Sequence, residues 1–264
     1  MIEDFYTCLP QVIAIARAAG KLIMEFYQGK NFTVRLKPDQ SPVTDADLAA
    51  HYYINDELLR LFPWPVVSEE SALLPPAEEQ PCTYWLVDPL DGTREFLEAT
   101  GQFSVNIALI HQGFPVLGII YAPIFQQLYY ASQGHGAFLQ LGEAPVEAIY
   151  CRSVDSQEVL VIASNRTAPE VLARYRVKLP GCIIMTFGSS LKFCFIAQGK
   201  ADLYIRRGPT GEWDTAAAQC LVEEAGGTVV DWQSRRLVYG KSNFRNEGFI
   251  ACGDSAYLQA LTVP

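Results

Sequence analysis

The sequence predicts an α/β protein in which helices and sheets form layers around a shared core. Helical periodicity opens the chain, short apolar runs fill its middle, and strands alternate with helices toward the end. Both patterns bury their apolar faces by packing in layers. The 264 residues suit one large domain or two closely packed halves, at roughly 150 residues per domain.

Composition and charge narrow the functional class. Apolar residues make up 50% of the chain, and glycine and proline are scattered, which is typical of a soluble globular protein. The 20 basic and 29 acidic residues give a net charge of −9. Such a surface repels phosphates, so binding of a nucleic acid polymer is disfavoured. An acidic protein acting on an anionic substrate needs a local reversal of charge, which bound metal ions supply.

The sequence indicates neither a targeting segment nor a disulfide framework. Residues 1–10 carry Glu3 and Asp4 rather than a basic stretch, and no run approaches about 18 uninterrupted apolar residues. The seven cysteines include no C-x-x-C pair, which argues against structural zinc. We therefore expect a cytoplasmic protein whose membrane association is at most peripheral, on the inner face of the membrane.

Two helices with a polar connection are expected first. Residues 11–28 place apolar side chains at helical spacing. Residues 31–41 are polar and broken by Pro38, which predicts an exposed strand or loop. A second helix is expected over residues 45–61, with Thr44 as its cap. Its predicted inner side carries Leu48, Tyr52, Leu58 and Leu59.

Strands dominate the middle of the chain. The runs 65–68 and 83–87 are short and apolar, and acidic residues follow each of them, which predicts buried strands ending in carboxylates. An antiparallel meander is expected over the runs 103–110, 116–121, 128–131 and 137–141.

The rhythm of the sequence changes near residues 145–158. Beyond this point, predicted strands alternate with predicted helices, as in a layered α/β unit. The strands are 159–163, 182–186 and 202–205, and the helices begin at Pro169 or span 189–197 and 215–225. We therefore divide the chain into an N-terminal α+β half, residues 1–150, and a C-terminal α/β half, residues 151–264, that completes the active site.

The most specific motif covers residues 85–93, where a predicted strand delivers two aspartates, a glycine and a threonine. Asp88 and Asp91, with the Leu90 carbonyl between them, can converge on hard cations, which prefer oxygen ligands. Gly92 lets the backbone approach closely, and free N–H groups there suit a phosphate. Taken alone, the motif is also compatible with an ordinary surface turn.

Further acidic residues stand beside other predicted elements. Glu69 and Glu70 follow a strand and Asp214 precedes a helix, and each alone could be a cap or a solvated end. If Glu69 and Asp214 converge with the two aspartates of the motif, their repulsion requires protonation or bound cations. We expect two or three Mg²⁺ ions, because metal pairs about 3.5–4 Å apart can activate water and stabilise the leaving oxygen of a phosphate ester.

Asp47 and Thr93 form the predicted water-activating pair. A threonine hydroxyl can orient the attacking water while a carboxylate behind it accepts the proton. The alternatives are helix capping for Asp47 and an ordinary first-turn hydroxyl for Thr93.

Taken in order along the chain, these motifs resemble the inositol monophosphatase superfamily of lithium-sensitive, magnesium-dependent phosphatases. The matching segments are Pro42-Val43-Thr44-Asp45-Ala46-Asp47, Ser68-Glu69-Glu70, Asp88-Pro89-Leu90-Asp91-Gly92-Thr93 and Trp213-Asp214-Thr215-Ala216-Ala217. Other segments are similar to the CysQ-type 3′(2′),5′-bisphosphate nucleotidases of that superfamily. These are Arg94-Glu95-Phe96, Gly188-Ser189-Ser190-Leu191-Lys192 and Gly208-Pro209-Thr210.

The resemblance implies a layered αβαβα sandwich of the inositol monophosphatase and fructose-1,6-bisphosphatase type. Its implied metal ligands are Glu69, Asp88 and the Leu90 carbonyl for one ion, Asp88, Asp91 and Asp214 for a second, and Glu69 for a third. Thr93 and Asp47 would activate water. Glu69 is preferred to Glu70 because it is the first acid after the strand.

The resemblance also implies a set of substrate contacts. These include Gly92, Thr93 and Asp214. Ser189, Ser190 and Lys192 would lie near the second phosphate or ribose, and Glu212 near the sugar. Lys192 and Arg206 could pair with the phosphate that is not cleaved. Helix capping is expected for both serines in any case, and surface solvation is the alternative for both cations. Lys37 belongs either to a loop that closes over the site or to the solvated surface.

The expected reaction is hydrolysis of adenosine 3′,5′-bisphosphate to AMP and phosphate, in sulfur metabolism, with 3′-phosphoadenosine 5′-phosphosulfate as a further candidate substrate. An inositol or sugar monophosphatase would keep the same catalytic residues. A non-catalytic sensor of nucleotide and metal is the alternative of another class, but the presence of both Asp47 and Thr93 argues for chemistry. The sequence distinguishes neither Mg²⁺ from Mn²⁺ nor one oligomeric state from another.

Overall fold

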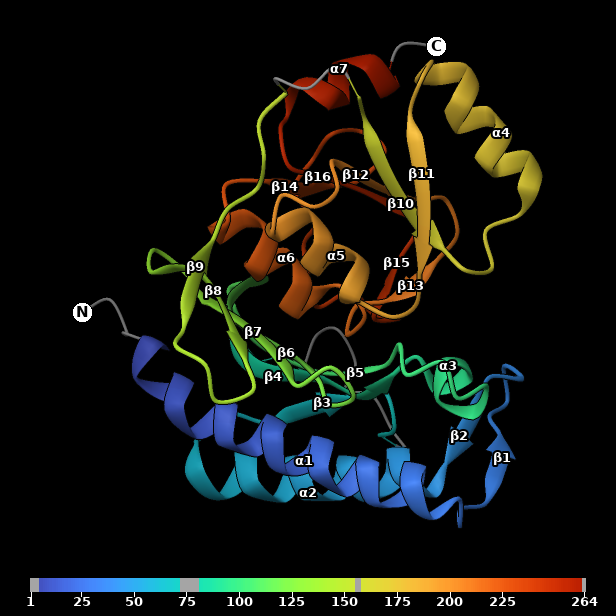
Figure 1. The fold of residues 1–264 in the computed structure, drawn as a ribbon. Coiled ribbons are helices and arrows are strands. Elements are labelled where there is room, and N and C mark those ends of the chain that lie inside the picture. The colour runs from blue at the N-terminus through green and yellow to red at the C-terminus, as the bar shows by residue number, and fades with distance from the viewer. Residues whose placement is uncertain (1–4, 72–80, 155–157, 263–264) are drawn as a thin grey trace.

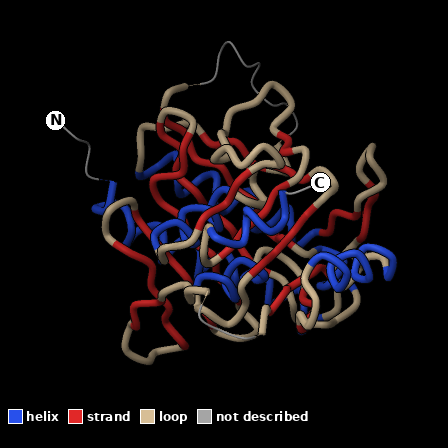
Figure 2. Tube along the Cα trace, turned by 90° about the horizontal axis from the view of Figure 1, so that it is seen from above, coloured by secondary structure: helices blue, strands red, loops and turns tan. Residues whose placement is uncertain are grey.

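The computed structural model describes residues 5–71, 81–154 and 158–262. Its elements form five layers, which Figure 1 shows from bottom to top as a helix pair, a large sheet, a second helix pair, a smaller sheet and two outer helices. This arrangement is the predicted αβαβα sandwich. Seen from above, helices and strands lie over one another, as such a stack requires (Figure 2).

The first helix layer consists of α1 (Leu9–Gly29), preceded by the 3-10 turn Phe5–Cys8, and α2 (Asp45–Leu61). The apolar face of α1 is buried against α2 and the large sheet. Each fully buried Val or Ile side chain contributes about 1.5–3 kcal/mol relative to an exposed one. Between the two helices, a hairpin of β1 (Val34–Leu36) and β2 (Pro42–Thr44) occupies the segment predicted as an exposed strand or loop.

The inner face of α2 differs from the prediction. Thr44 caps the helix in a reciprocal capping box with Asp47, as the sequence suggested for Thr44. However, Tyr52 is 62% exposed and Leu59 is 51% exposed. The buried side chains are Ala46, Asp47, Ala50, Ile54 and Leu58. Small alanines on this face let α2 approach α1 closely, so side-chain size misled the prediction of the buried side.

The large sheet has the strand order β3-β4-β5-β6-β7-β8-β9. Its strands are β3 (Val66–Ser68), β4 (Thr83–Asp91), β5 (Ser104–His111), β6 (Phe114–Ala122), β7 (Gln127–Ser132), β8 (Gly136–Leu141) and β9 (Glu147–Ile149). The neighbours β3 and β4 run parallel, and the strands from β4 onward form the predicted antiparallel meander. The sequence analysis missed β9, which is short and largely exposed.

The smaller sheet has the order β11-β10-β12-β16-β14. Its strands are β10 (Leu160–Ser164), β11 (Ile183–Phe187), β12 (Leu203–Arg206), β14 (Thr228–Val230) and β16 (Phe249–Cys252). The helices α5 (Leu191–Ala197) and α6 (Ala216–Glu224) lie between the sheets, with α4 (Pro169–Lys178) and α7 (Ala256–Thr262) on the outer side. A two-stranded ladder of β13 (Thr210–Gly211) and β15 (Arg245–Asn246) completes this region.

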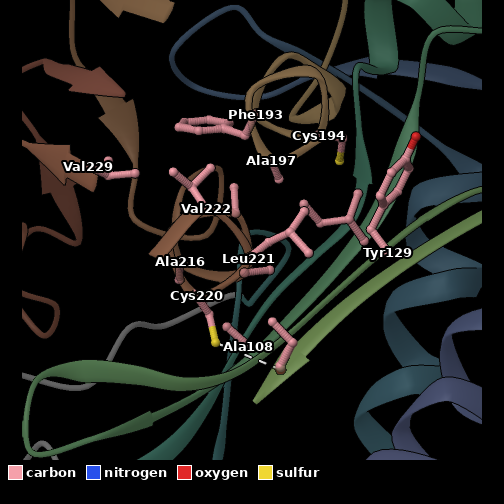
Figure 3. Close-up of a cluster of buried hydrophobic side chains, with 14 of the residues drawn as sticks. Ala108, Tyr129, Phe193, Cys194, Ala197, Ala216, Cys220, Leu221, Val222 and Val229 are labelled. Atoms are coloured by element: carbon pink, nitrogen blue, oxygen red, sulfur yellow. Dashed lines mark hydrogen bonds between the residues drawn. The ribbon is translucent and has the colours of Figure 1, made fainter. Parts of the chain in front are cut away.

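A buried cluster of apolar side chains joins the two sheets through α5 and α6 (Figure 3). It includes Phe193, Cys194 and Ala197 of α5, Cys220, Leu221 and Val222 of α6, Ala108 of β5 and Tyr129 of β7. A second cluster fills the space between α1, α2 and the opposite face of the large sheet. The first cluster takes residues from both sides of residue 150, so the division of the chain there stays a prediction.

Among the described residues, one helical stretch, Phe5–Gly29, is long and apolar enough to span a membrane by length and composition. Core helices of globular proteins meet the same criteria. The apolar face of α1 packs on α2 and β6, which accounts for its composition.

Candidate active site

Two neighbouring strands bring the first acidic side chains together. Glu69 follows β3 directly, and its backbone N–H donates to the Val87 carbonyl of β4 at 3.1 Å. Asp88 is the next residue on β4 and is 1% exposed. Because β3 and β4 are parallel neighbours and Ser68 pairs with Val87, Glu69 and Asp88 lie side by side at the end of β3.

A bulge in β4 places Asp88 and Asp91 on one side of the strand. The strand continues to Asp91 rather than ending at residue 87 as predicted. Asp88 pairs with Asn106 of β5, whereas Asp91 pairs with Ser104, so the register shifts between them. Residues three apart on a regular strand point to opposite faces, but one extra residue in a bulge returns them to the same face.

Gly92 ends this strand with a backbone conformation that requires glycine. Its φ is +95°, and a Cβ atom there would lie 3.0 Å from the carbonyl oxygen of Gln102. A side chain would therefore be strained and would also press on residues 102–103, which lead into β5. The sharp turn at Gly92 starts α3 (Thr93–Leu97) directly beside the two aspartates.

Asp214 joins the acidic residues from the C-terminal part of the chain. It lies just before α6, and the Gly211 N–H donates to its Oδ2 at 2.9 Å. One carboxylate oxygen from each of Glu69, Asp88 and Asp214 lies within 4.8 Å of the others. A divalent cation coordinated by oxygen at about 2.0–2.6 Å can bridge such a group.

Burial and mutual repulsion raise the pKa values of these carboxyls. For Asp88 the largest cause is burial, followed by the charges of Glu69, Asp91 and Asp214. Burial also raises the pKa of Asp214, with Asp91 as the next cause. Burial raises the pKa of Asp91, although the nearby Lys192 ammonium opposes the shift. Cations bound here would therefore stabilise the ionised form of the cluster.

Lys37 reaches the edge of the cluster from the β1–β2 turn. Its Nζ lies 2.7 Å from Glu69 Oε1 and 2.6 Å from Glu70 Oε1. Although burial opposes the change, these carboxylates raise the pKa of Lys37. Burial and the neighbouring Glu69 charge raise the pKa of Glu70 to about 7. The alternative that Lys37 is solvated at the surface is therefore wrong. Of the two adjacent acids, Glu69 is the one with a carboxylate oxygen near those of Asp88 and Asp214.

The predicted water-activating residues are in direct contact. Thr93 Oγ1 donates to Asp47 Oδ1 at 2.9 Å, and the Leu90 carbonyl oxygen lies 3.3 Å from the same hydroxyl. Asp47 Oδ2 accepts hydrogen bonds from the Thr44 N–H at 2.8 Å and the Thr44 hydroxyl at 2.5 Å. Asp47 therefore caps α2 and contacts Thr93 with its two different oxygens. Burial raises the pKa of Asp47.

A cavity of about 370 Å³ opens beside the acidic cluster. Its wall includes the acids Asp91, Glu95 and Asp214 and the basic residues Arg94, Arg166, Lys192 and Arg206. A second cavity of about 350 Å³, lined by Lys37 and Glu69, shares Thr210 and Asp214 with the first. The carboxylates thus lie where a cation-rich chamber meets a second opening.

The first cavity contains polar groups that the protein itself does not satisfy. Within the described part of the chain, Arg206 Nε and Thr210 Oγ1 are buried without a hydrogen-bond partner. An unsatisfied buried donor costs about 1–3 kcal/mol, which an anionic ligand would offset. Lys192 is 5% exposed and donates to the Ser189 carbonyl. Burial lowers the pKa of Lys192 to about 8.

Comparison with known sequences decides the family. The inositol monophosphatase family model matches residues 6–260 of this chain. The chain belongs to the inositol monophosphatase family.

Several relatives within this family are similar over nearly their whole length. The chain is 45% identical over 247 residues to the 3′(2′),5′-bisphosphate nucleotidase CysQ of Salmonella typhimurium, covering 91% of this chain and 98% of that protein. The equivalent protein of Escherichia coli K12 is 44% identical over 244 residues, with the same coverage. The crystal structure of CysQ from Bacteroides thetaiotaomicron matches with a TM-score of 0.80 and 32% identity, covering 96% of this chain and 99% of that chain.

Enzymes of the inositol monophosphatase family use divalent metal ions. In this member, the cluster of Glu69, Asp88 and Asp214 offers oxygen ligands at a spacing that fits such ions. The raised pKa values of Asp88 and Asp214 follow from the same burial and crowding of carboxylates, which a bound cation would relieve.

The two serines of this family member differ in their contacts. Ser190 occupies the N-cap position of α5, but its hydroxyl donates to Asn106 Oδ1 at 2.8 Å, so the expected side-chain cap is wrong. Its backbone N–H instead donates to Asp91. Ser189 Oγ accepts from the Leu191 N–H at 3.3 Å, as a capping side chain does. Both serines line the cation-rich cavity, where their contact with substrate stays a prediction.

Glu212 has a structural environment that the sequence did not suggest. Its carboxylate is fully buried and accepts from the Gly240 N–H at 2.7 Å and from Lys241 Nζ at 2.8 Å. The side chain does not line the cavity of about 370 Å³. In this structure Glu212 braces the loop at residues 240–241, and its contact with a sugar stays a prediction.

Sequence reasoning missed one ion-pair group at the cavity. Arg166, which follows β10, pairs with Glu95 and lies 2.8 Å from Glu98 Oε1. Glu95 is buried in α3, close to the turn at Gly92. These partners are 71 and 68 residues apart, so no local pattern signals the pairing.

Proposed function

We propose that the protein is a magnesium-dependent phosphomonoesterase that removes the 3′-phosphate of adenosine 3′,5′-bisphosphate, giving AMP and phosphate. The proposal rests on the acidic cluster of Glu69, Asp88 and Asp214 lying beside a chamber lined by four basic side chains. The relatives named 3′(2′),5′-bisphosphate nucleotidase support the choice of substrate. 3′-Phosphoadenosine 5′-phosphosulfate, which has the same 3′-phosphate, is the second proposed substrate.

Two or three Mg²⁺ ions would be held by Glu69, Asp88, the Leu90 carbonyl, Asp91 and Asp214. Ions bound there would lower the pKa of water and would compensate the negative charge on the leaving oxygen. The donor set consists entirely of carboxylate and carbonyl oxygens, which magnesium prefers over nitrogen and sulfur ligands.

Thr93 and Asp47 orient and deprotonate the attacking water in this proposal. Because the Thr93 hydroxyl donates to Asp47 at 2.9 Å, its oxygen lone pairs remain free to accept a proton from water. The proton can then pass through Thr93 toward Asp47. The hydrogen bonds from Thr44 hold the Asp47 carboxylate in place while it accepts this proton.

The cation-rich side of the cavity binds the phosphate that is not cleaved. Arg206 has a buried Nε without a protein partner, and Lys192 is buried close by. Charge-assisted hydrogen bonds from such groups to phosphate are roughly twice as strong as neutral ones. A substrate with two phosphates therefore satisfies both ends of the chamber, with one at the acidic cluster and one at the cations.

Phosphate release from a panel of substrates tests this function. Purified protein with Mg²⁺ should hydrolyse adenosine 3′,5′-bisphosphate with a higher kcat/KM than inositol phosphate, and a chelator or lithium should suppress the activity. Equal or better turnover of inositol phosphate would overturn the substrate assignment. Binding of the nucleotide without turnover of any substrate would indicate a sensor instead.

We also propose a cytoplasmic location with at most peripheral membrane association. The apolar face of α1 is buried in the core, so this helix has no further apolar stripe to insert into a bilayer. Fractionation of cells that express the tagged protein, with salt washing of the membranes, tests the location.

A further inference from the structure

A third cavity lies on the far side of β12 from the proposed active site. It has a volume of about 290 Å³ and is enclosed by α4, the end of β12 and Trp232. The apolar part of its wall consists of Ala173, Tyr175, Val177, Ile205 and Trp232. The Tyr175 hydroxyl donates to the Ile205 carbonyl at 3.0 Å, so the polar end of this ring is already satisfied.

The charge of this cavity is opposite to that of the protein as a whole. Arg174, Lys178 and Arg207 line it, and no Asp or Glu is among its lining residues in the described part of the chain. The carboxylate next to Trp232 in the sequence, Asp231, is bound by Arg235 at 2.8 Å. In a chain with a net charge of −9, Arg174 and Arg207 beside an apolar wall favour an anionic ligand.

The arrangement of the side chains indicates what shape of ligand fits. The guanidinium of Arg207 lies 4.8 Å from the centre of the Trp232 ring, so a flat cationic and aromatic surface forms one wall. Flat apolar rings pack well on such a surface through stacking and cation–π contacts. The volume of about 290 Å³ is near the lower end of the range typical for small-molecule sites, about 300–1,000 Å³.

Strand alternation links this cavity to the active site. Tyr204 and Arg206 line the active cavity, whereas Ile205 and Arg207 line the third cavity. Successive residues at the end of β12 thus point to opposite faces of the same strand, as strand geometry requires. A ligand that contacts Ile205 and Arg207 therefore contacts the same strand segment that carries Arg206.

We propose that this cavity is a second ligand site, for a small molecule with a flat apolar body and one anionic group, and that its occupation changes the affinity of the active site for substrate. The first part of the proposal is independent of the reaction catalysed. The second part rests on the proposed function, because it is read out as a change in KM.

Anilinonaphthalene sulfonate is a suitable probe because it combines flat aromatic rings with one sulfonate. Its fluorescence should increase saturably when it binds to the magnesium-loaded protein. Arg174→Glu should weaken this binding roughly tenfold or more, because a charge-assisted contact is replaced by repulsion. Arg176→Glu is the matched control, since Arg176 is exposed on the same helix but does not line the cavity. The control should bind the probe as the unaltered protein does.

Two results would overturn the site. One is equal loss of probe binding in both variants, and the other is complete displacement of the probe by inorganic phosphate, which would place it in the active cavity.

For the coupling, KM for adenosine 3′,5′-bisphosphate should shift at least twofold at saturating probe, and the shift should be absent at the same probe concentration in Arg174→Glu. An unchanged KM at saturating probe would refute the coupling while leaving the binding result intact. Absence of any hydrolysis would instead count against the proposed function.

Discussion

The two walls of the active cavity are built in different ways. On the acidic wall, Asp88 and Asp91 come from one bulged strand, and a backbone N–H and the Asn106 amide fix the Asp91 carboxylate. On the basic wall, Lys192, Arg206 and Arg166 are long side chains from the smaller sheet and the helix that precedes β12. Backbone register therefore fixes the acidic wall, whereas long side chains form the basic wall, to which we assign binding of the uncleaved phosphate.

This comparison predicts the largest losses of kcat on the acidic wall. Asp91→Asn should lower kcat by at least about 10³-fold, the upper end of the cost of removing a fixed electrostatic group. Phosphate release measures the effect, and circular dichroism checks the fold. Asp56→Asn, at an exposed position of α2, is the control and should leave kcat unchanged. Unaltered turnover by Asp91→Asn would remove this residue from the mechanism.

The next largest effect is expected at Thr93, which tests positioning of water rather than charge. Thr93→Ala should lower kcat by about 10²-fold or more, because the hydroxyl between water and Asp47 is lost. Thr93→Ser keeps the hydroxyl and should retain most of the activity. Equal loss in both variants would point to packing of the methyl group instead of proton transfer.

A smaller effect, on KM more than on kcat, is expected on the basic wall. Arg206→Gln should raise KM for adenosine 3′,5′-bisphosphate by about 10- to 100-fold, since a hydrogen bond to a charged group contributes about 1.5–3 kcal/mol. The exposed Arg235 provides the control Arg235→Gln, for which KM should not change. If Arg206→Gln lowered kcat as severely as Asp91→Asn, the two walls would not be functionally distinct.

The smallest effect concerns stability, and it should appear only without metal. The folded-state pKa values of Asp88, Asp91 and Asp214 lie above their ordinary values, and that of Glu70 is about 7. A carboxyl group whose pKa is raised in the folded state contributes its full stability at pH values below its ordinary pKa. This stability is lost as the pH rises through the raised pKa. The Tm of chelator-treated protein should therefore fall from acidic to neutral pH, by about 2–4 °C per kcal/mol.

Scanning calorimetry across this pH range measures the slope. Saturating Mg²⁺ should flatten it, because the ions replace protons as the compensating charge. A Tm of metal-free protein that rises with pH over this range would contradict the raised pKa values.

Much of this site could be predicted from local motifs, and the remainder depends on tertiary packing. Pro89 inside a strand was a usable signal, because proline within sheets is largely confined to edges and bulges. Nothing local reports that Arg166 pairs with Glu95, since the contact exists only after the two sheets stack. The burial of Glu212 against Lys241 is of the same kind.

Periodicity predicted many of the helices and strands, while the five-layer order was implied by the family resemblance; the buried face of α2 was predicted wrongly. The inner face of α2 was misassigned because Tyr52 and Leu59 outweighed Ala46 and Ala50 in apolar size. Close helix packing selects small side chains, so the identity of the neighbouring helix decides which side is buried. The sequence alone does not show that α1 packs against α2, so the buried side of α2 becomes clear only from the fold.

The central claim is that separate stretches of the chain build one divalent-cation site. Anomalous diffraction from a crystal grown with Mn²⁺ tests it most directly. We predict peaks within coordination distance of Glu69, Asp88 and Asp214. Peaks found only elsewhere, or none at saturating Mn²⁺, would contradict the account.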